Sequence, residues 1–388
     1  MTTTTTAPGP TTAEDVLAGV DRLAPAIAAR APEIEAARRL PADLLADLAA
    51  AGCFRLVRPP SHGGLGADLS DALRVSEALA RADGSVGWTV TIGATSWCDL
   101  AGLPRATFDA VFGGDADPVI AGVFSPSGTA TPEGDGRFRV DGRWAFASGC
   151  EHATWLYANT IEAGDGPRMR TVLLAPEDVE IQDTWDALGL RGTGSHHFVA
   201  DGVVLPAERT FLTFEGPPAV DVPVVRLPPP ALYALLLSAV ALGVAQGALD
   251  DVLAVAGERV PLLADRAMSG DPTFHHDLAT ADARLRAARA LLYADAGAAW
   301  RSAQAGAPLA PEERARVRAT AAWATATAVA VVDTAHHHGG GGAVYASSPL
   351  ARRLRDAHAM AQHFLVRPDT FTTAGAVLSG MEVDLSIF

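Results

Sequence analysis

The sequence has few cysteines, and none of them forms a closely spaced pair. Cys53, Cys98 and Cys150 are the three thiols of a 388-residue chain. An odd number of scattered cysteines indicates neither a disulfide framework nor a zinc site of the CxxC type. We therefore expect a protein that folds in a reducing compartment, and the cytoplasm is the predicted location.

Positive charge is also scarce. The chain has 30 Lys and Arg residues against 45 Asp and Glu, which gives a formal net charge of −15 at pH 7. Because an acidic surface repels polyanions, nucleic acid and anionic membranes are not expected partners. Hydrophobic residues make up 49% of the chain. That content is enough for a large core, and the length predicts two or three domains.

No segment has the composition of an export signal or of an uninterrupted membrane span. The opening MTTTTTAPGPTT has no basic start and no apolar run, and we expect residues 1–14 to form a disordered tail. Residues 231–256 form a long apolar stretch that is interrupted by Gln246, Asp250 and Asp251. This stretch predicts a helix buried in a bundle or in a subunit interface.

Two groups of enzyme motifs are missing as well. No GxGxxG follows an expected strand, so a Rossmann-type site for NADH is not predicted. The run His336–His338 has no HExxH motif beside it. Successive side chains of a helix point about 100° apart, so these three rings cannot converge on one ion. We predict no metal site.

The sequence patterns follow the order helical, β, helical. Apolar residues recur at helical spacing in residues 15–118, and short β-rich pieces with turn residues fill 119–225. The helical period returns over 226–388. These ranges predict an α+β protein with an N-terminal helical domain, a middle β-domain and a C-terminal helical domain.

Several segments resemble the acyl-CoA dehydrogenase superfamily. Residues 40–88, from LPADLL to SVGW, are similar to its N-terminal domain, and residues 185–210, from WDALGLRG to AERT, to the end of its middle domain. Residues 142–155 (GRWAFASGCEHATW) and 347–363 (SSPLARRLRDAHAMAQH) are similar to the two-component flavin-dependent monooxygenases of that superfamily, which include aromatic hydroxylases. The resemblance implies a middle β-barrel domain and a C-terminal four-helix bundle.

The resemblance also implies a function, the oxygenase component of such a monooxygenase. It would use reduced flavin, FADH2 or FMNH2, and O2, and hydroxylate an aromatic or heteroaromatic small molecule of indole or polyketide type through a C4a-hydroperoxide. The implied partner is a transient NAD(P)H-dependent flavin reductase, and the implied assembly is a homotetramer. N-oxygenation of an amine, an acyl-CoA dehydrogenase reaction and a degenerate flavin-binding protein remain open. No glutamate occurs in residues 362–375, where many dehydrogenases carry their base.

His363 and Ser148 are the catalytic residues that the resemblance implies, with His358 as a second candidate histidine. The resemblance places a histidine near residue 363 beside the reactive edge of the flavin. With an ordinary pKa near 6.5, it would accept a proton or hydrogen-bond the oxygenated flavin, and a structural role in the bundle is the alternative. The spacing puts Arg352, Asp356 and His363 on one helix face.

Ser148 lies at the end of an expected strand, directly before Gly149. Its hydroxyl can hydrogen-bond flavin N5, and a plain turn is the alternative interpretation. Trp144, Phe146 and Trp155 are expected to exclude water around it, as an oxygenated flavin requires.

The remaining predicted flavin contacts are polar loop residues, one arginine and part of the glycine run after the histidines. They are Ser125, Thr129, Thr193, Ser195, Gly340, Gly341 and Arg355. Glycine lets backbone N–H groups reach phosphate, and the resemblance brings this glycine run to the flavin of a neighbouring subunit. A helix cap for the glycines and a bundle ion pair for the arginine are the alternatives.

Three residues form the predicted substrate pocket: Trp88, Thr95 and Trp97. The rings of Trp88 and Trp97 suit the walls of an apolar pocket, and packing in the core is the alternative. Aromatic hydroxylases of this type often have a histidine near residue 95, where this chain has threonine. Formation of a phenolate by that route is therefore not expected.

Overall fold

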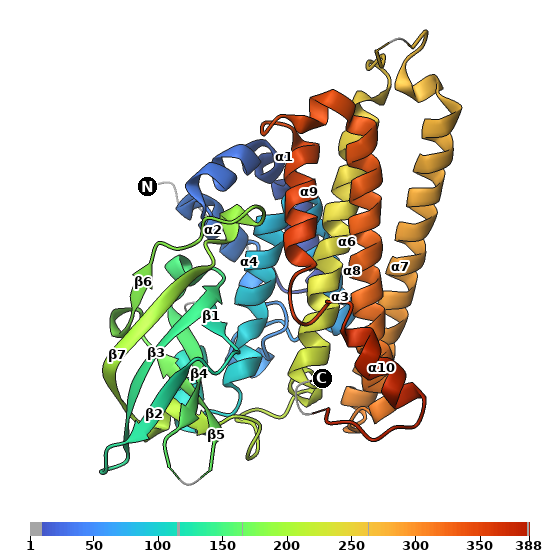
Figure 1. Cartoon of the computed structure of the whole chain (residues 1–388). Coiled ribbons are helices and arrows are strands. Elements are labelled where there is room, and N and C mark those ends of the chain that lie inside the picture. Colours follow the sequence, from blue (N-terminus) through green and yellow to red (C-terminus); the bar gives the residue numbers. More distant parts are fainter. Residues whose placement is uncertain (1–9, 115–116, 165, 263, 386–387) are drawn as a thin grey trace.

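The computed structural model describes residues 10–114, 117–164, 166–262, 264–385 and 388. Within them the expected order of helical, β and helical parts is confirmed (Figure 1). Most of the predicted tail, residues 1–9, lies outside the described residues. The first helix begins at Ala13, so the last two residues of the predicted tail are helical.

Five helices form the N-terminal part: α1 (Ala13–Ala37), α2 (Ala42–Ala50), α3 (Leu69–Ala82), α4 (Gly84–Thr95) and α5 (Arg105–Phe112). Helix α1 begins at a capping box, in which Thr12 Oγ1 accepts from the Asp15 backbone N–H at 3.1 Å and the Asp15 carboxylate accepts from the Thr12 N–H at 3.0 Å. Helix α4 is buried along almost its whole length, and Figure 1 shows it between the sheet and the C-terminal helices. Helix α4 therefore forms part of the boundary between the sheet and the C-terminal helices.

Eight strands form one mixed sheet: β1 (Ile120–Val123), β2 (Gly128–Pro132), β3 (Arg137–Ala147), β4 (Trp155–Glu162), β5 (Arg168–Leu174), β6 (Glu180–Gln182), β7 (His196–Pro206) and β8 (Thr210–Leu212). Their order is β6-β7-β3-β2-β4-β5-β8, and β1 pairs with β4. The path ends at β6 and β8, two strands of three residues that each pair with one described neighbour. The predicted closed barrel is therefore wrong, because closure requires the two edge strands to pair.

Four long helices form the C-terminal bundle: α6 (Pro229–Ala256), α7 (Pro272–Gln304), α8 (Pro311–Gly339) and α9 (Pro349–Met360). The short helix α10 (Thr370–Leu378) packs on α8. Helix α6 is the one described helix long and apolar enough to cross a membrane. Of its most apolar 18-residue segment, 94% is buried inside the molecule. The prediction of a buried helix in this stretch is thus confirmed.

Helices α3 and α6 approach so closely at Gly243 that no side chain fits there. An added Cβ would lie 2.2 Å from the Glu77 carbonyl oxygen and 2.9 Å from the Ala80 Cβ. We expect Gly243→Ala to lower the free energy of unfolding by about 1–3 kcal/mol, because the two helices must separate. Denaturant melting measures the change.

Gly297→Ala in α7 is the matched control for Gly243→Ala. Its Cβ would meet only the flexible end of Arg301, at 3.4 Å. Alanine is the better helix former by about 0.5–1 kcal/mol, so this variant should be as stable as the wild type or more so. Equal effects at the two glycines would contradict the close packing of α3 on α6.

Candidate active site

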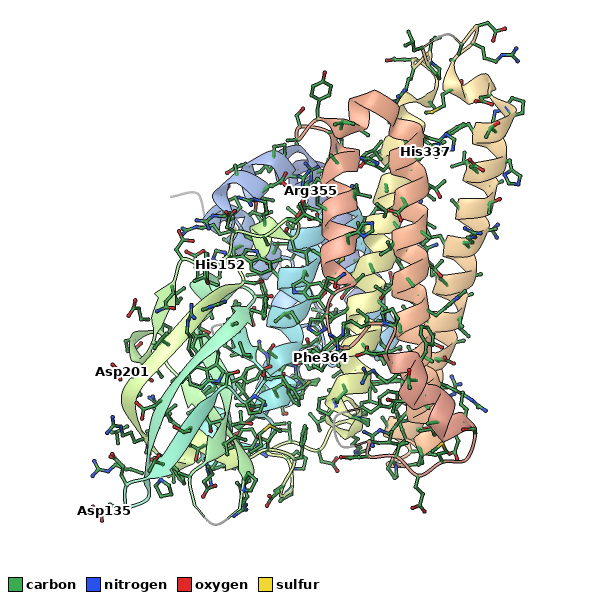
Figure 2. The ribbon with its side chains drawn as sticks, viewed as in Figure 1. Asp135, His152, Asp201, His337, Arg355 and Phe364 are labelled. Carbon is green, nitrogen blue, oxygen red and sulfur yellow. The ribbon has the colours of Figure 1, made fainter. Side chains whose placement is uncertain are left out.

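A cavity of about 600 Å³ lies where the sheet meets the bundle. Its walls come from α4 and the following 3₁₀ turn (Ser96–Leu100), from β1, β3 and β4, and from the start of α6 and the loop after α9. Most of its surface is apolar or aromatic, and Figure 2 shows one wall residue, Phe364, at this junction. The polar side chains that line it include Ser96, Asp99, Ser125, Ser148, Tyr157, Ser195, Tyr233, Gln362 and His363.

The end of β3 presents Phe146 and Ser148 to this cavity. The register between β3 and β7 shifts between Trp144 and Ala147, and a bulge of this kind re-aims side chains. Phe146 has a φ of 68°, which is strained for a non-glycine residue, and its side chain is 70% exposed. The bulge therefore holds an aromatic ring open at the cavity, next to the Ser148 hydroxyl.

Three hydroxyl groups form a chain that ends on Ser148. Thr193 donates to the Leu190 carbonyl at 2.8 Å, its oxygen lies 2.7 Å from that of Ser195, and the Ser195 oxygen lies 2.8 Å from that of Ser148. Each hydroxyl has a single proton. Because the Thr193 proton goes to Leu190, Ser195 must donate to Thr193, and Ser148 must donate to Ser195.

This order of protons leaves Ser148 as a hydrogen-bond acceptor. Its oxygen already accepts from Trp88 Nε1 at 3.1 Å, and one lone pair remains. The cavity therefore offers an acceptor at this point to any ligand that brings an N–H group.

His363 lies at the same end of the cavity. Its ring is edge-on to Trp88, with the ring centroids 5.6 Å apart. Helix α9 ends at Met360, and the His363 N–H donates to the Met360 carbonyl at 3.0 Å. The prediction that His363 continues the helix face of Arg352 and Asp356 is therefore wrong. The turn after the helix brings the ring to the cavity.

The surroundings of His363 keep it neutral. Burial lowers the pKa of His363 to about 4, and the positive charge of Arg318 adds to the effect. The ordinary value expected from the sequence does not apply. The Leu365 N–H donates to Nδ1 at 3.4 Å, which assigns the proton of the neutral ring to Nε2. His363 is thus a hydrogen-bond donor and not a ready proton acceptor at Nε2.

Asp99 lines the same cavity and has two tyrosine partners. Tyr157 donates to its Oδ2 at 2.9 Å, and Tyr233 donates to the same oxygen. Burial raises the pKa of Asp99 to about 6, although both tyrosine bonds act in the opposite direction. The sequence analysis missed all three residues. One signal was available, since Asp99 and Tyr233 are isolated polar residues in apolar stretches, and such residues need partners.

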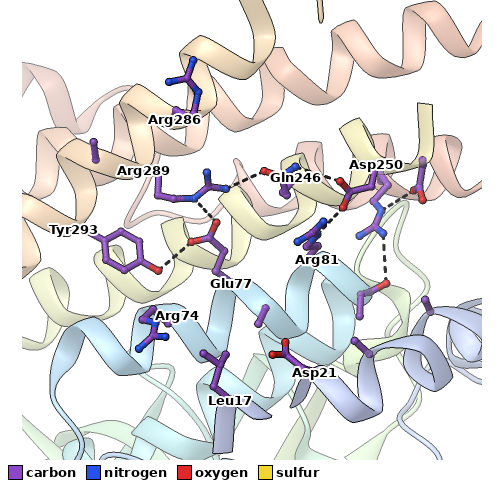
Figure 3. Close-up of a pocket in the computed structure, with 17 residues that line it drawn as sticks. Leu17, Asp21, Arg74, Glu77, Arg81, Gln246, Asp250, Arg286, Arg289 and Tyr293 are labelled. Atoms are coloured by element: carbon purple, nitrogen blue, oxygen red, sulfur yellow. Dashed lines mark hydrogen bonds and ion pairs between the residues drawn. The ribbon is translucent and has the colours of Figure 1, made fainter. Parts of the chain in front are cut away.

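A second and larger cavity, of about 890 Å³, lies between α1, α3, α6 and α7 (Figure 3). Five arginines line it, and each bonds a carboxylate. Arg289 contacts Glu77 at 2.6 Å, and Arg81 contacts Asp250 at 2.6 Å. These paired charges tie helices together. The apolar cavity with few convergent polar groups is the better candidate for the active site.

Of the predicted residues, the structure brings five to the apolar cavity: Trp88, Ser125, Ser148, Ser195 and His363. Thr193 joins them through its bond to Ser195. Thr95 and Trp97 do not line the cavity. Thr95 is buried and donates to the Thr91 carbonyl at 2.7 Å, and Trp97 packs edge-on against Phe108. Both belong to the core of the N-terminal helices.

The other predicted flavin contacts lie elsewhere on the chain. Thr129 is exposed on β2, and the Arg355 side chain pairs with Glu35 of α1. Gly340 and Gly341 precede α9, a helix of 12 residues that is about 18 Å long, and His363 follows the other end of that helix.

His358 is not among the residues that line the cavity. Its exposed ring contacts Asp333 of α8, with Nε2 2.8 Å from the carboxylate.

The aromatic residues expected around Ser148 have different positions. Phe146 lines the cavity. Trp144 is fully buried inside the sheet, where it stacks on Phe198 and donates to the Asn159 carbonyl at 2.8 Å. Trp155 packs under Arg209. The ring beside Phe146 is Trp185, which was not predicted, at 6.2 Å between centroids.

Comparison with known proteins gives consistent matches. Residues 13–101 match the family model for the acyl-CoA dehydrogenase N-terminal domain, and residues 235–368 the model for its C-terminal domain. The chain is 32% identical to indole-3-acetate monooxygenase of Pseudomonas putida, covering 91% of each protein. It is 33% identical to the oxygenase subunit HsaA of a flavin-dependent monooxygenase of Rhodococcus jostii, covering 90% of this chain and 94% of that one.

Solved structures give the same result. The 3-HSA hydroxylase of Rhodococcus superposes with a TM-score of 0.89 at 30% identity, covering 96% of this chain and 99% of that one. XiaF of Streptomyces, solved with FADH2 and glycerol, superposes with a TM-score of 0.88 at 26% identity, covering 95% of this chain and 96% of that one.

Proposed function

The chain belongs to the acyl-CoA dehydrogenase superfamily, in its branch of flavin-dependent monooxygenases, and from this premise we propose that it is the oxygenase component of a two-component system. It uses reduced flavin and O2 to hydroxylate an aromatic or heteroaromatic small molecule. The relatives named above act as monooxygenases and hydroxylases, which supports the reaction type.

The observation that carries this proposal is the ordered hydroxyl chain that ends on Ser148 in an apolar cavity. Reduced flavin has an N–H group at N5, and Ser148 has an acceptor lone pair to receive it. The open ring of Phe146 offers an aromatic surface for a flat ligand beside it. The residues present therefore fit the isoalloxazine ring of a reduced flavin.

Each residue at this end of the cavity has a separate task. Bound reduced flavin supplies the electrons that activate O2. Ser148 would accept a hydrogen bond from flavin N5–H and so hold the flavin ring in place. Trp88 and Ser195 hold the Ser148 hydroxyl. His363 donates from Nε2 to developing negative charge on oxygen. The apolar walls would exclude water, whose access favours release of the reduced oxygen as hydrogen peroxide instead of its transfer to the substrate.

The reduced flavin comes from a separate NAD(P)H-dependent reductase. The sequence has no dinucleotide-binding fingerprint of the Rossmann type. The oxygenase relatives are named as subunits or components, which supports a transient reductase partner.

The finer features of this function remain proposals. FAD is the proposed flavin, supported by the FADH2 complex of XiaF, with FMN as the alternative. The proposed assembly is a homotetramer in which Gly340 and Gly341 reach the flavin of a neighbouring subunit, and the proposed location is the cytoplasm. Carbon hydroxylation is proposed over N-oxygenation, because the named relatives include a resorcinol hydroxylase and an indole-3-acetate monooxygenase.

The proposed function is tested by supplying the protein with a flavin reductase, NADH, flavin and a panel of phenols and indoles. Hydroxylated product that requires the protein supports it. Formation of an enoyl thioester from an acyl-CoA, with reduction of a dye and without any oxygenated product, would assign the chain to the dehydrogenases instead.

Ser148→Ala should reduce the preference for reduced over oxidised flavin. Oxidised flavin has no proton at N5, so the Ser148 bond stabilises the reduced form alone. Losing one hydrogen bond of about 0.5–1.5 kcal/mol corresponds to a change of about 2–12-fold in the ratio of the two dissociation constants. Anaerobic titration with both forms measures this ratio.

Ser125→Ala is the matched control for Ser148→Ala, because Ser125 lies on the same cavity outside the hydroxyl chain. It should leave the ratio unchanged. A wild-type ratio retained by Ser148→Ala would show that Ser148 does not contact N5.

A further inference from the structure

Asp99 is a carboxylate in an apolar cavity with no cation beside it. It forms no salt bridge in the described part of the chain, and its two tyrosine partners are neutral donors. The other titratable side chains of the cavity wall are these tyrosines and His363, which is neutral because of its lowered pKa. Asp99 is therefore the charged group of the cavity at neutral pH.

The tyrosines orient the carboxylate and leave one of its oxygens available. Tyr157 comes from β4 and Tyr233 from α6, and both hydroxyls donate to Oδ2. An ionised carboxylate accepts about four hydrogen bonds. No donor to Oδ1 is found among the described residues. A buried ionised group with spare acceptor capacity is costly unless a ligand supplies the missing partner.

Asp99 lies at a distance from the end of the cavity that Ser148 and His363 occupy. Along α4 and the 3₁₀ turn that follows it, the cavity is lined in order by Trp88, Ile92, Ser96 and Asp99. A molecule that reacts beside His363 thus has its remote end near Asp99.

We propose that Asp99, positioned by Tyr157 and Tyr233, recognises the substrate by accepting a hydrogen bond from an N–H or O–H group remote from the oxygenated carbon. The substrate class is an uncharged or cationic aromatic with such a donor, and an aromatic carboxylate is rejected at this end. This inference rests on the proposed function, because it takes the cavity to hold the aromatic substrate.

The chemistry of the buried group supports selection by charge. Burial raises the pKa of Asp99 to about 6, so it is ionised at neutral pH. A second carboxylate would face it in a medium of low dielectric constant, whereas a donor would satisfy its free oxygen.

The experiment measures binding without turnover. Tryptamine and indole-3-acetate form one pair, which shares the indole ring and differs in the charge of the side chain, and indole itself is the uncharged reference. Tyramine and 4-hydroxyphenylacetate form a second pair. Dissociation constants are measured by calorimetry on the protein with bound reduced flavin under argon, and again without flavin. Wild type should bind the ammonium member of each pair about 10–100-fold more tightly than the carboxylate member.

Asp99→Asn should reduce this preference to within about threefold, since asparagine keeps an acceptor for the tyrosines but removes the charge. Its thermal melting temperature without ligand at about pH 8 should equal or exceed that of wild type, because an uncompensated charge is lost. A purely structural aspartate would give a lower melting temperature. Tyr233→Phe should weaken the preference only in part.

The proposal is overturned if the carboxylate members bind as tightly as the ammonium members in wild type, if no member binds, or if Asp99→Asn keeps the wild-type preference. These results are distinct from failure of the proposed function. A protein that selects ligands through Asp99 but forms no oxygenated product would retain the recognition site and lose the monooxygenase assignment.

Discussion

His363→Leu is expected to lower the rate of product formation by about 10²–10³-fold, the range for loss of one preorganised donor. Flavin affinity should change little, because Ser148 and the aromatic walls hold the ring independently. Electrons that no longer reach the product should appear as hydrogen peroxide. The measurement is the ratio of hydroxylated product to peroxide for each NADH consumed.

His363→Asn separates the two roles open to this histidine. Asparagine retains an N–H donor, so it should keep more activity than leucine if His363 acts as a donor. If His363 were a proton acceptor, both variants would lose activity to a similar extent, by about 10²–10⁴-fold. His358→Asn is the control, since that exposed ring contacts Asp333 and should leave the rate unchanged.

The pH dependence follows from the lowered pKa of His363. The folded state binds this proton more weakly than the unfolded state, where the pKa is near 6.5. Stability from this group is therefore complete above about pH 6.5 and is lost as pH falls towards the folded value of about 4. Near pH 6.5, the pH profile of activity should therefore be the same for wild type and for His363→Asn. A step there that His363→Asn removes would mean that the ring is solvated.

Asp356→Ala is expected to destabilise the protein by about 1–3 kcal/mol and to weaken binding of reduced flavin. The Asp356 carboxylate accepts the Leu190 N–H at 2.6 Å in the interior, and alanine leaves this donor without its partner. The loop is tightly seated, because a Cβ on Gly189 would lie 2.1 Å from the Arg355 carbonyl oxygen. Release of Leu190 also frees the carbonyl that orders the Thr193 proton.

Asp356→Asn is the matched variant, because it keeps an acceptor for Leu190. Burial and the nearby charge of Asp83 raise the pKa of Asp356. The wild-type carboxyl thus stabilises the fold most when it is protonated. Its contribution to the free energy of unfolding declines as pH rises from about 4. Asp356→Asn should gain stability relative to wild type as pH rises. Equal destabilisation by alanine and asparagine at every pH would contradict this account. Urea melting at several pH values decides between them.

The sequence predicted those site residues whose signal is local. Ser148 follows directly from an expected strand end and a turn, and this segment also carried the family resemblance. His363 was found through the resemblance, although its expected helical position was wrong because α9 ends at Met360. The prediction of His363 depended on the similarity of residues 347–363 to the monooxygenases. The turn that brings the ring to the cavity has no recognisable sequence pattern.

Other parts of the site depend on contacts between distant segments. Asp99 and Tyr233 are 134 positions apart and meet only when α6 packs beside the 3₁₀ turn. The direction of the hydroxyl chain depends on one carbonyl, that of Leu190, in a left-handed conformation. Barrel closure failed as a prediction for a similar reason. Strand patterns reveal individual strands, whereas closure depends on whether β6 and β8 meet.

The central claim is that this one cavity holds reduced flavin and substrate together and transfers oxygen between them. A single turnover under isotopically labelled O2, started from protein with reduced flavin and substrate, tests it most directly. The account predicts that the new hydroxyl group of the product contains labelled oxygen in wild type, and that His363→Leu diverts the label to hydrogen peroxide. Unlabelled oxygen in the wild-type product, or full recovery of the label as peroxide with substrate bound, would contradict it.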